Sequence, residues 1–166
     1  LLDIAYQNGV NYFDTAYIYH DGESERITGH ILNKYSRSSY YLATKLPIWL
    51  VQSLEDAKRI FEDQLRCLDK DDIDFYLLHA LNKNEFDRIV KLGVLEYCDE
   101  LKAAGKMKYF GFSFHDEFPS FSHIIQYRDW DFCQIQYNYM DRNIQAGDKG
   151  YELAAKLEVP LIIMEP

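Results

Sequence analysis

The chain has 166 residues, of which 48% are hydrophobic and 16% aromatic, and its formal net charge at pH 7 is −9. This length and composition are typical of one globular domain with a sizeable core, and they exclude a disordered chain. An acidic balance without any cluster of lysines or arginines argues against nucleic acid and anionic membrane surfaces as partners.

Neither a membrane span nor a secretory signal is visible. No apolar run reaches the roughly 18 residues that a spanning helix needs, and no signal-peptide pattern opens the chain. Cys67, Cys98 and Cys133 are far apart and set in apolar contexts. That pattern is typical of buried thiols in a reducing compartment and not of a disulfide frame or a zinc site. We therefore expect a cytoplasmic protein.

The first third of the chain alternates helices and strands. Residues 1–8 resemble the last turns of a helix that ends at Gly9, and a short strand then ends at Asp14. An amphipathic helix follows over 24–34, and a buried strand over 40–45 ends in a lysine. Ser53 begins a capping box and a helix with apolar residues at helical spacing.

The alternation continues to the end of the chain. Further strands are predicted over 73–79, 108–113, 131–136 and 160–164, and helices over 94–104, 119–126 and 150–158. Gly111 suggests a close backbone approach within its strand. Strand ends recur at intervals of roughly 30 residues, which is one βα unit each time. Six such units without a GxGxxG fingerprint favour an α/β fold of the (β/α)8 TIM-barrel type over a doubly wound sheet.

The number of units bears on domain organisation. A complete barrel of this kind has eight strands and about 250 residues. We therefore expect residues 1–166 to form a single partial-barrel domain that contains strands two to seven of a longer protein.

Polar residues close several of these strands. Asp14, Lys45 and His79 each end a strand, and Tyr19 follows the first of them. Taken singly, Asp14 could cap a loop, Lys45 could be a surface residue, His79 could be a core histidine, and Tyr19 is one of 14 tyrosines.

Together these residues predict a site, because the carboxyl ends of barrel strands meet at one mouth. A buried lysine needs an anionic partner, so Lys45 and Asp14 most simply form an ion pair. An ammonium beside a phenol lowers the tyrosine pKa from its usual value of about 10. Tyr19 would then serve as a general acid, with His79 orienting a carbonyl oxygen.

The motifs DTAxxYxxGESE, ATK, DFYLLH, GFS and CQIQ occur in this order and resemble the aldo-keto reductase family. The resemblance implies that Asp14, Tyr19, Lys45 and His79 are the catalytic tetrad, with tyrosine donating a proton while NADPH or NADH delivers hydride. It also implies a small-molecule carbonyl substrate. The residues that it assigns to cofactor binding are Ser113, Gln134, Met164 and Glu165.

Two positions depart from the family pattern. Phe114 stands where the family usually has an asparagine after the strand serine, and Met164 replaces a tyrosine that stacks on the nicotinamide. A polarisable thioether can still pack on a ring face. Beside the site, Trp49 either lines an apolar substrate pocket or folds onto the barrel rim, and His115 is a second candidate substrate residue.

The segments GFSFHD, CQIQYNYMD and IIMEP are similar to a bacterial branch of iron–sulfur aldo-keto reductases. That similarity implies a 4Fe-4S cluster bound by residues outside this chain, since no spacing within the chain resembles a metal site. The predicted function is NAD(P)H-dependent reduction of an aldehyde or ketone. The alternatives are a non-catalytic nicotinamide-binding barrel, an electron-transfer reductase coupled to such a cluster, and another barrel enzyme such as an isomerase or hydrolase.

Overall fold

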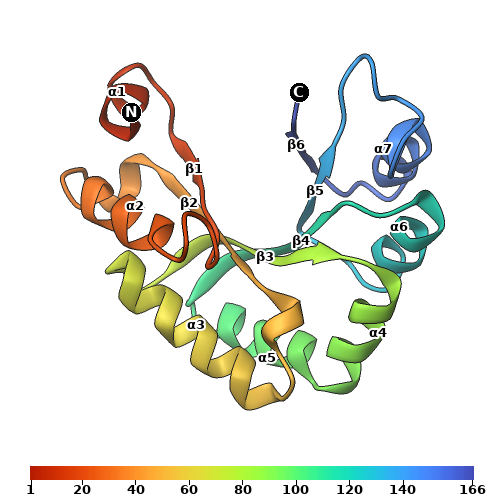
Figure 1. Cartoon of the computed structure of the whole chain (residues 1–166), viewed down its shortest axis with the longest axis horizontal. Helices are drawn as coiled ribbons and strands as arrows, with labels where there is room; N and C mark the ends of the chain where they lie inside the picture. The colour runs from red at the N-terminus through yellow and green to blue at the C-terminus, as the bar shows by residue number, and fades with distance from the viewer.

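The computed structural model describes residues 1–166 and is built around a six-stranded parallel sheet (Figure 1). Every strand pairs with the strands before and after it in the chain, so the sheet order is β1-β2-β3-β4-β5-β6. The strands are β1 (Tyr12–Asp14), β2 (Tyr41–Leu46), β3 (Ile73–Leu81), β4 (Met107–Phe114), β5 (Phe132–Gln136) and β6 (Leu161–Met164). The order never reverses, as it would in a doubly wound sheet.

The sheet curls into an open half-barrel, and the helices lie mainly around its outer, convex side (Figure 1). The helices are α1 (Leu2–Gln7), α2 (Ser24–Leu32), α3 (Leu54–Leu68), α4 (Lys83–Lys91), α5 (Val94–Ala103), α6 (Phe118–Ile125) and α7 (Gly147–Lys156). None of them combines the length and the apolar character that a membrane crossing requires. This architecture is part of a (β/α)8 barrel, and it confirms the fold class that the sequence predicts.

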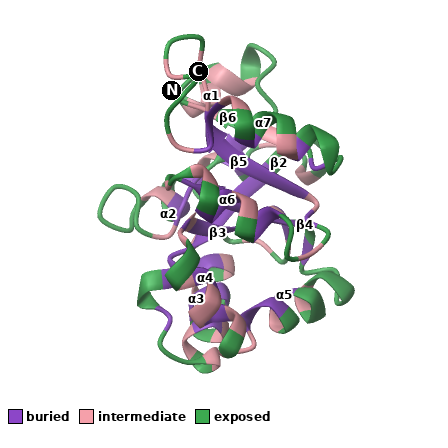
Figure 2. Cartoon of the chain, turned by 90° about the vertical axis from the view of Figure 1, so that its right-hand side faces the viewer, coloured by how far each residue is buried: buried purple, intermediate pink, exposed green.

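Alternate residues of each strand face opposite sides of the sheet. Outward-facing side chains such as Phe13, Leu42 and Phe112 join helix side chains in a core of 33 buried residues. Ala43, Leu77 and Phe132 form a separate cluster on the inner face. Figure 2 shows buried residues concentrated on the strands and exposed ones on loops and outer helix surfaces.

The candidate site lies on the inner face of the sheet, where alternate residues of each strand form a row of inward-facing side chains, the inner row. Positions two residues beyond the inner cluster, on the same face, bring polar side chains to the carboxyl ends of the strands. Those positions are Lys45 after Ala43, His79 after Leu77 and Gln134 after Phe132.

Two glycines permit close backbone contacts. A Cβ on Gly111 would lie 2.4 Å from the carbonyl oxygen of Phe132 on the neighbouring strand, which confirms the close approach predicted there. A Cβ on Gly29 would lie 2.1 Å from the carbonyl oxygen of Leu68. Helix α2 can therefore cross the end of α3 only with glycine at this position.

Three predictions of secondary structure need correction. Strand β3 continues past His79 to Leu81, because Leu81 pairs with Phe114 after a register shift at which Ala80 adopts a left-handed φ of 51°. Helix α4 is absent from the sequence prediction, although the Asn82 side chain caps it by accepting from the Glu85 amide at 3.0 Å. Helix α7 begins at Gly147, three residues earlier than predicted.

The cysteines also differ from expectation in one case. Cys98 and Cys133 are buried as predicted, whereas Cys67 on α3 is only partly buried. The capping box at the start of α3 is present, with Ser53 and Asp56 exchanging hydrogen bonds.

Candidate active site

Lys45 is the centre of the site. Its ammonium donates to Asp14 Oδ1 in an ion pair, which confirms the contact predicted from the two strand ends. The same Nζ lies 2.9 Å from the carbonyl oxygen of Thr15 and 3.4 Å from Tyr19 Oη. Lys45 is 2% exposed and Tyr19 is 38% exposed, so the buried charge is presented to a phenol that solvent and ligands can reach.

Behind Lys45 lies a buried polar network around Gln64. The Gln64 amide nitrogen lies 2.8 Å from Glu25 Oε1 and 3.0 Å from the carbonyl oxygen of Lys45. Its Oε1 accepts from Tyr76 Oη at 2.7 Å, and the Thr44 hydroxyl donates to Glu25. These bonds join α2, β2, α3 and β3 and fix the backbone that carries the ammonium.

Burial raises the pKa of Glu25 despite hydrogen bonds from Thr44 and Gln64 and the nearby charge of Lys45. Sequence reasoning missed both Glu25 and Gln64. The available signal was a glutamine on the apolar stripe of α3, four residues after Ile60 and four before Leu68. A polar residue on a buried helix face needs partners and therefore indicates a network.

His79 faces Tyr19 across the site. Their rings are edge-to-face with centroids 5.7 Å apart, and His79 is 8% exposed. Burial, the charge of Lys45 and the nearby His115 together lower the pKa of His79 from 6.5 to about 4. The imidazole is therefore neutral near pH 7, and its Nδ1 is buried without a hydrogen-bond partner.

Ser113 and Gln134 are register neighbours on β4 and β5. Ser113 Oγ accepts from the Ala80 amide at 2.8 Å, which leaves the hydroxyl proton free to donate elsewhere. Gln134 Nε2 donates to Asp14 Oδ2 at 2.7 Å, and Gln134 Oε1 is buried without a partner. One donor and one acceptor side by side match the C=O and NH2 of a primary carboxamide.

The two departures from the family pattern have different surroundings. Phe114 is fully buried on the outer face, with its ring 5.2 Å from that of Phe121, so it does not enter the inner row of the site. Met164 pairs in register with Gln136 and is partly buried. Glu165 is exposed, and its carbonyl oxygen accepts from Asn138 Nδ2 at 3.1 Å.

Trp49 lies beside His79, with ring centroids 5.2 Å apart. It belongs to a short turn, Ile48–Leu50, that is held by Arg88 of α4. The Arg88 guanidinium donates to the carbonyl oxygens of Ile48, at 2.7 Å, and of Val51. Arg88 is a further residue that sequence reasoning missed, because α4 itself was not predicted.

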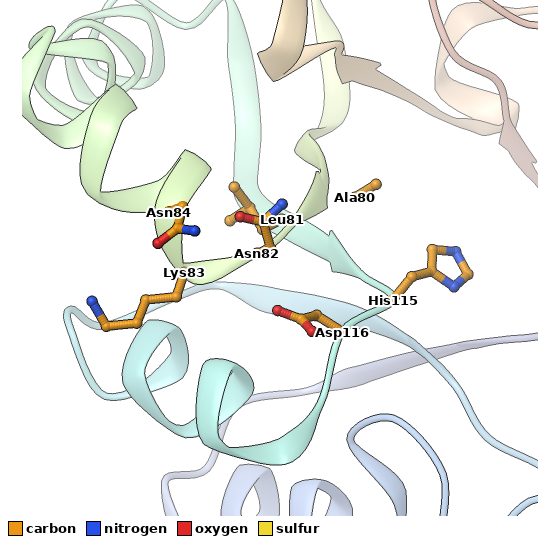
Figure 3. Close-up of a pocket in the computed structure, with 7 residues that line it drawn as sticks. All are labelled: Ala80, Leu81, Asn82, Lys83, Asn84, His115 and Asp116. Carbon is orange, nitrogen blue, oxygen red and sulfur yellow. The ribbon is translucent and has the colours of Figure 1, made fainter.

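A groove of about 430 Å³ opens at the ends of β3 and β4 (Figure 3). Its lining residues are Ala80, Leu81, Asn82, Lys83, Asn84, His115 and Asp116. In Figure 3 the Asp116 carboxylate points toward the loop that carries Asn82, whereas the His115 imidazole points away from it. Trp49 packs directly against His79, whereas His115 is exposed at the edge of the groove.

The model of the aldo/keto reductase family matches residues 1–166, the whole chain. The chain belongs to the aldo/keto reductase family.

Solved structures of aldo-keto reductases share this fold. AKR11C1 from Bacillus halodurans (holo form) is 26% identical with a TM-score of 0.81, covering 98% of this chain and 54% of its own. The thermostable enzyme Tm1743, in complex with the inhibitor epalrestat, is 25% identical with a TM-score of 0.81, covering 99% and 58%. An aldo-keto reductase from Klebsiella pneumoniae in complex with NADPH is 24% identical with a TM-score of 0.78, covering 99% and 56%. This chain thus spans little more than half the length of these reductases.

Proposed function

We propose that the protein reduces an aldehyde or ketone with NADPH or NADH and that Tyr19 donates the proton. The observation that carries this proposal is the contact of the Lys45 ammonium with both Asp14 and Tyr19 Oη. Membership of the aldo/keto reductase family supports the reaction class.

The charges of the site suit proton donation by a phenol. When Tyr19 gives its proton to a carbonyl oxygen, the phenolate left behind lies beside the buried ammonium of Lys45. Asp14 balances that ammonium, so the site gains no uncompensated buried charge before reaction. Neutral His79 carries one ring N–H, which can donate to the same carbonyl oxygen and orient it.

The cofactor assignment rests on complementary hydrogen-bonding groups. The free Ser113 hydroxyl proton fits the oxygen of a nicotinamide carboxamide, and the unpartnered Gln134 Oε1 fits its NH2 group. Met164, the last residue of β6, and Glu165, which follows it, would contact the nicotinamide ring. When bound, a reduced nicotinamide dinucleotide supplies the hydride.

We assign Trp49 and His115 to the substrate. The half-exposed indole of Trp49 gives the site an apolar wall beside His79. His115 and the polar loop around Asn82 line the adjoining groove. A small carbonyl compound with an apolar group near the carbonyl and a polar tail fits both surfaces.

Substitution Tyr19→Phe tests the proposal. We expect turnover of small aldehydes to fall at least about 100-fold, because general acid catalysis contributes that much. The dissociation constant for NADPH or NADH, measured by fluorescence titration, should stay unchanged. Tyr127→Phe is the matched control, since Tyr127 is a half-exposed tyrosine that packs on Phe86 of α4. Unchanged turnover in Tyr19→Phe would rule out this proton donor, and wild-type binding without turnover would favour a non-catalytic nicotinamide-binding barrel.

The iron–sulfur branch stays a prediction about other parts of the protein. The three cysteines lie on α3, α5 and β5, and no group of three His, Cys, Asp or Glu side chains is arranged to hold a metal ion. Cluster ligands would therefore come from outside residues 1–166. We also propose a cytoplasmic location, in which the free thiols of Cys98 and Cys133 stay reduced.

A further inference from the structure

Gln134 contacts a residue far away in the chain. Its Nε2 donates to Asp14 Oδ2 at 2.7 Å, across 120 residues of sequence. The two side chains come from β5 and β1, which share no hydrogen bonds within the sheet. Gln134 is 3% exposed, and this bond links it to the carboxylate that balances Lys45.

The chemistry of Asp14 fixes which way the glutamine amide points. A carboxylate paired with an ammonium is ionised and can only accept hydrogen bonds. The NH2 group of Gln134 must therefore face Asp14, and its oxygen must face away. That oxygen is the buried Oε1 without a partner. An acceptor left unpaired in a buried site is costly, so it favours a ligand that brings an N–H group.

We propose that Gln134 couples the nicotinamide carboxamide to the Asp14–Lys45 ion pair, so that Asp14 sets the protein's preference for cofactors with a carboxamide NH2. This inference rests on the proposed function, since it takes the nicotinamide as the ligand. Gln134 is then both a cofactor contact and a positioning residue for Asp14.

Substitution Asp14→Asn reverses the arrangement. The oxygen of the introduced amide faces the Lys45 ammonium, so its NH2 group turns toward Gln134. Gln134 then offers its oxygen to that NH2 group and its own NH2 group to the ligand. Two NH2 groups cannot hydrogen-bond each other by their protons, so the NH2 group of the nicotinamide carboxamide loses its acceptor on Gln134.

A matched pair of nucleotides measures this effect. NADP+ carries the carboxamide, and its 3-acetylpyridine analogue carries a methyl ketone without any N–H at the same place. In the wild type we expect the analogue to bind about tenfold more weakly, because it leaves Oε1 unpaired. The ratio of the two dissociation constants, measured by calorimetry, should fall to about one in Asp14→Asn and in Gln134→Met. It should stay at its wild-type value in Tyr19→Phe, which has no contact with Gln134.

A second readout does not depend on Asp14→Asn folding. Gln134→Met removes the donor to Asp14 Oδ2, so we expect a lower kcat even at saturating nucleotide. In Gln134→Met, a raised KM for the nucleotide with an unchanged kcat would overturn the coupling. A ratio of the two dissociation constants near one in the wild type would also overturn it, as would a ratio that Asp14→Asn leaves unchanged. The last two results leave carbonyl reduction itself intact, whereas failure of the wild type to bind either nucleotide would overturn the proposed function as well.

Discussion

Acidification should lower the free energy of unfolding, and part of this loss should come from the protonation of His79. Burial lowers the pKa of this imidazole from 6.5 to about 4, so the unfolded chain takes up a proton that the folded protein excludes. The stabilisation is fully present above pH 6.5 and is lost as the pH falls toward 4. At about 1.4 kcal/mol per pKa unit, the full effect is about 3 kcal/mol, of which about 2 kcal/mol is lost by pH 5.

Urea unfolding at several pH values measures this loss. Between pH 8 and pH 5 the wild type should lose about 2 kcal/mol more unfolding free energy than His79→Gln, which cannot titrate there. His30→Gln is the control, because His30 is exposed on α2 and should leave the pH dependence close to that of the wild type. Parallel pH profiles for wild type and His79→Gln would refute the reasoning that burial suppresses the charge of His79.

Three further predictions concern the packing. Gly29→Ala should destabilise the protein by about 2 kcal/mol, seen as a lower melting temperature, because the new Cβ meets the Leu68 carbonyl oxygen; an unchanged melting temperature would contradict the helix crossing. Glu25→Ala should cost about 2 kcal/mol in urea unfolding, since the buried Gln64 amide loses an acceptor, and Glu25→Gln should cost less. Burial raises the pKa of the Cys133 thiol to about 12, so a thiol reagent should modify it only after unfolding, and rapid labelling of the native protein would oppose this.

Much of the site follows from strand parity and from the cost of buried charge. Lys45 and Asp14 could be paired from sequence because adjacent parallel strands end together and a buried lysine requires an anion. The sequence also predicts that Phe114 faces outward, because its neighbour Ser113 faces inward and successive strand residues point to opposite faces of the sheet. A departure from a family motif therefore has to be read together with the face on which it lies.

Other features depend on tertiary contacts that no local pattern encodes. Alanine rarely adopts positive φ, and Ala80 does so where its amide binds Ser113 and the chain turns into α4. The bond between Gln134 and Asp14 joins strands that are not neighbours in the sheet, so only the curl of the sheet brings them together. Local propensity contains no information on such a pair.

The separation of inner and outer strand residues also affects how this sequence can diversify. Under the proposed function, substitutions on the inner row of the strands and at the groove residues Asn82, Asn84 and His115 would alter ligand contacts, whereas the aromatic core between sheet and helices is built from the alternate strand positions. Under the proposed carbonyl reduction, a mutational library restricted to the first set would sample new carbonyl specificities without changing the larger core. Substitutions in the second set would change thermal stability and leave the side chains of the inner row and the groove unchanged.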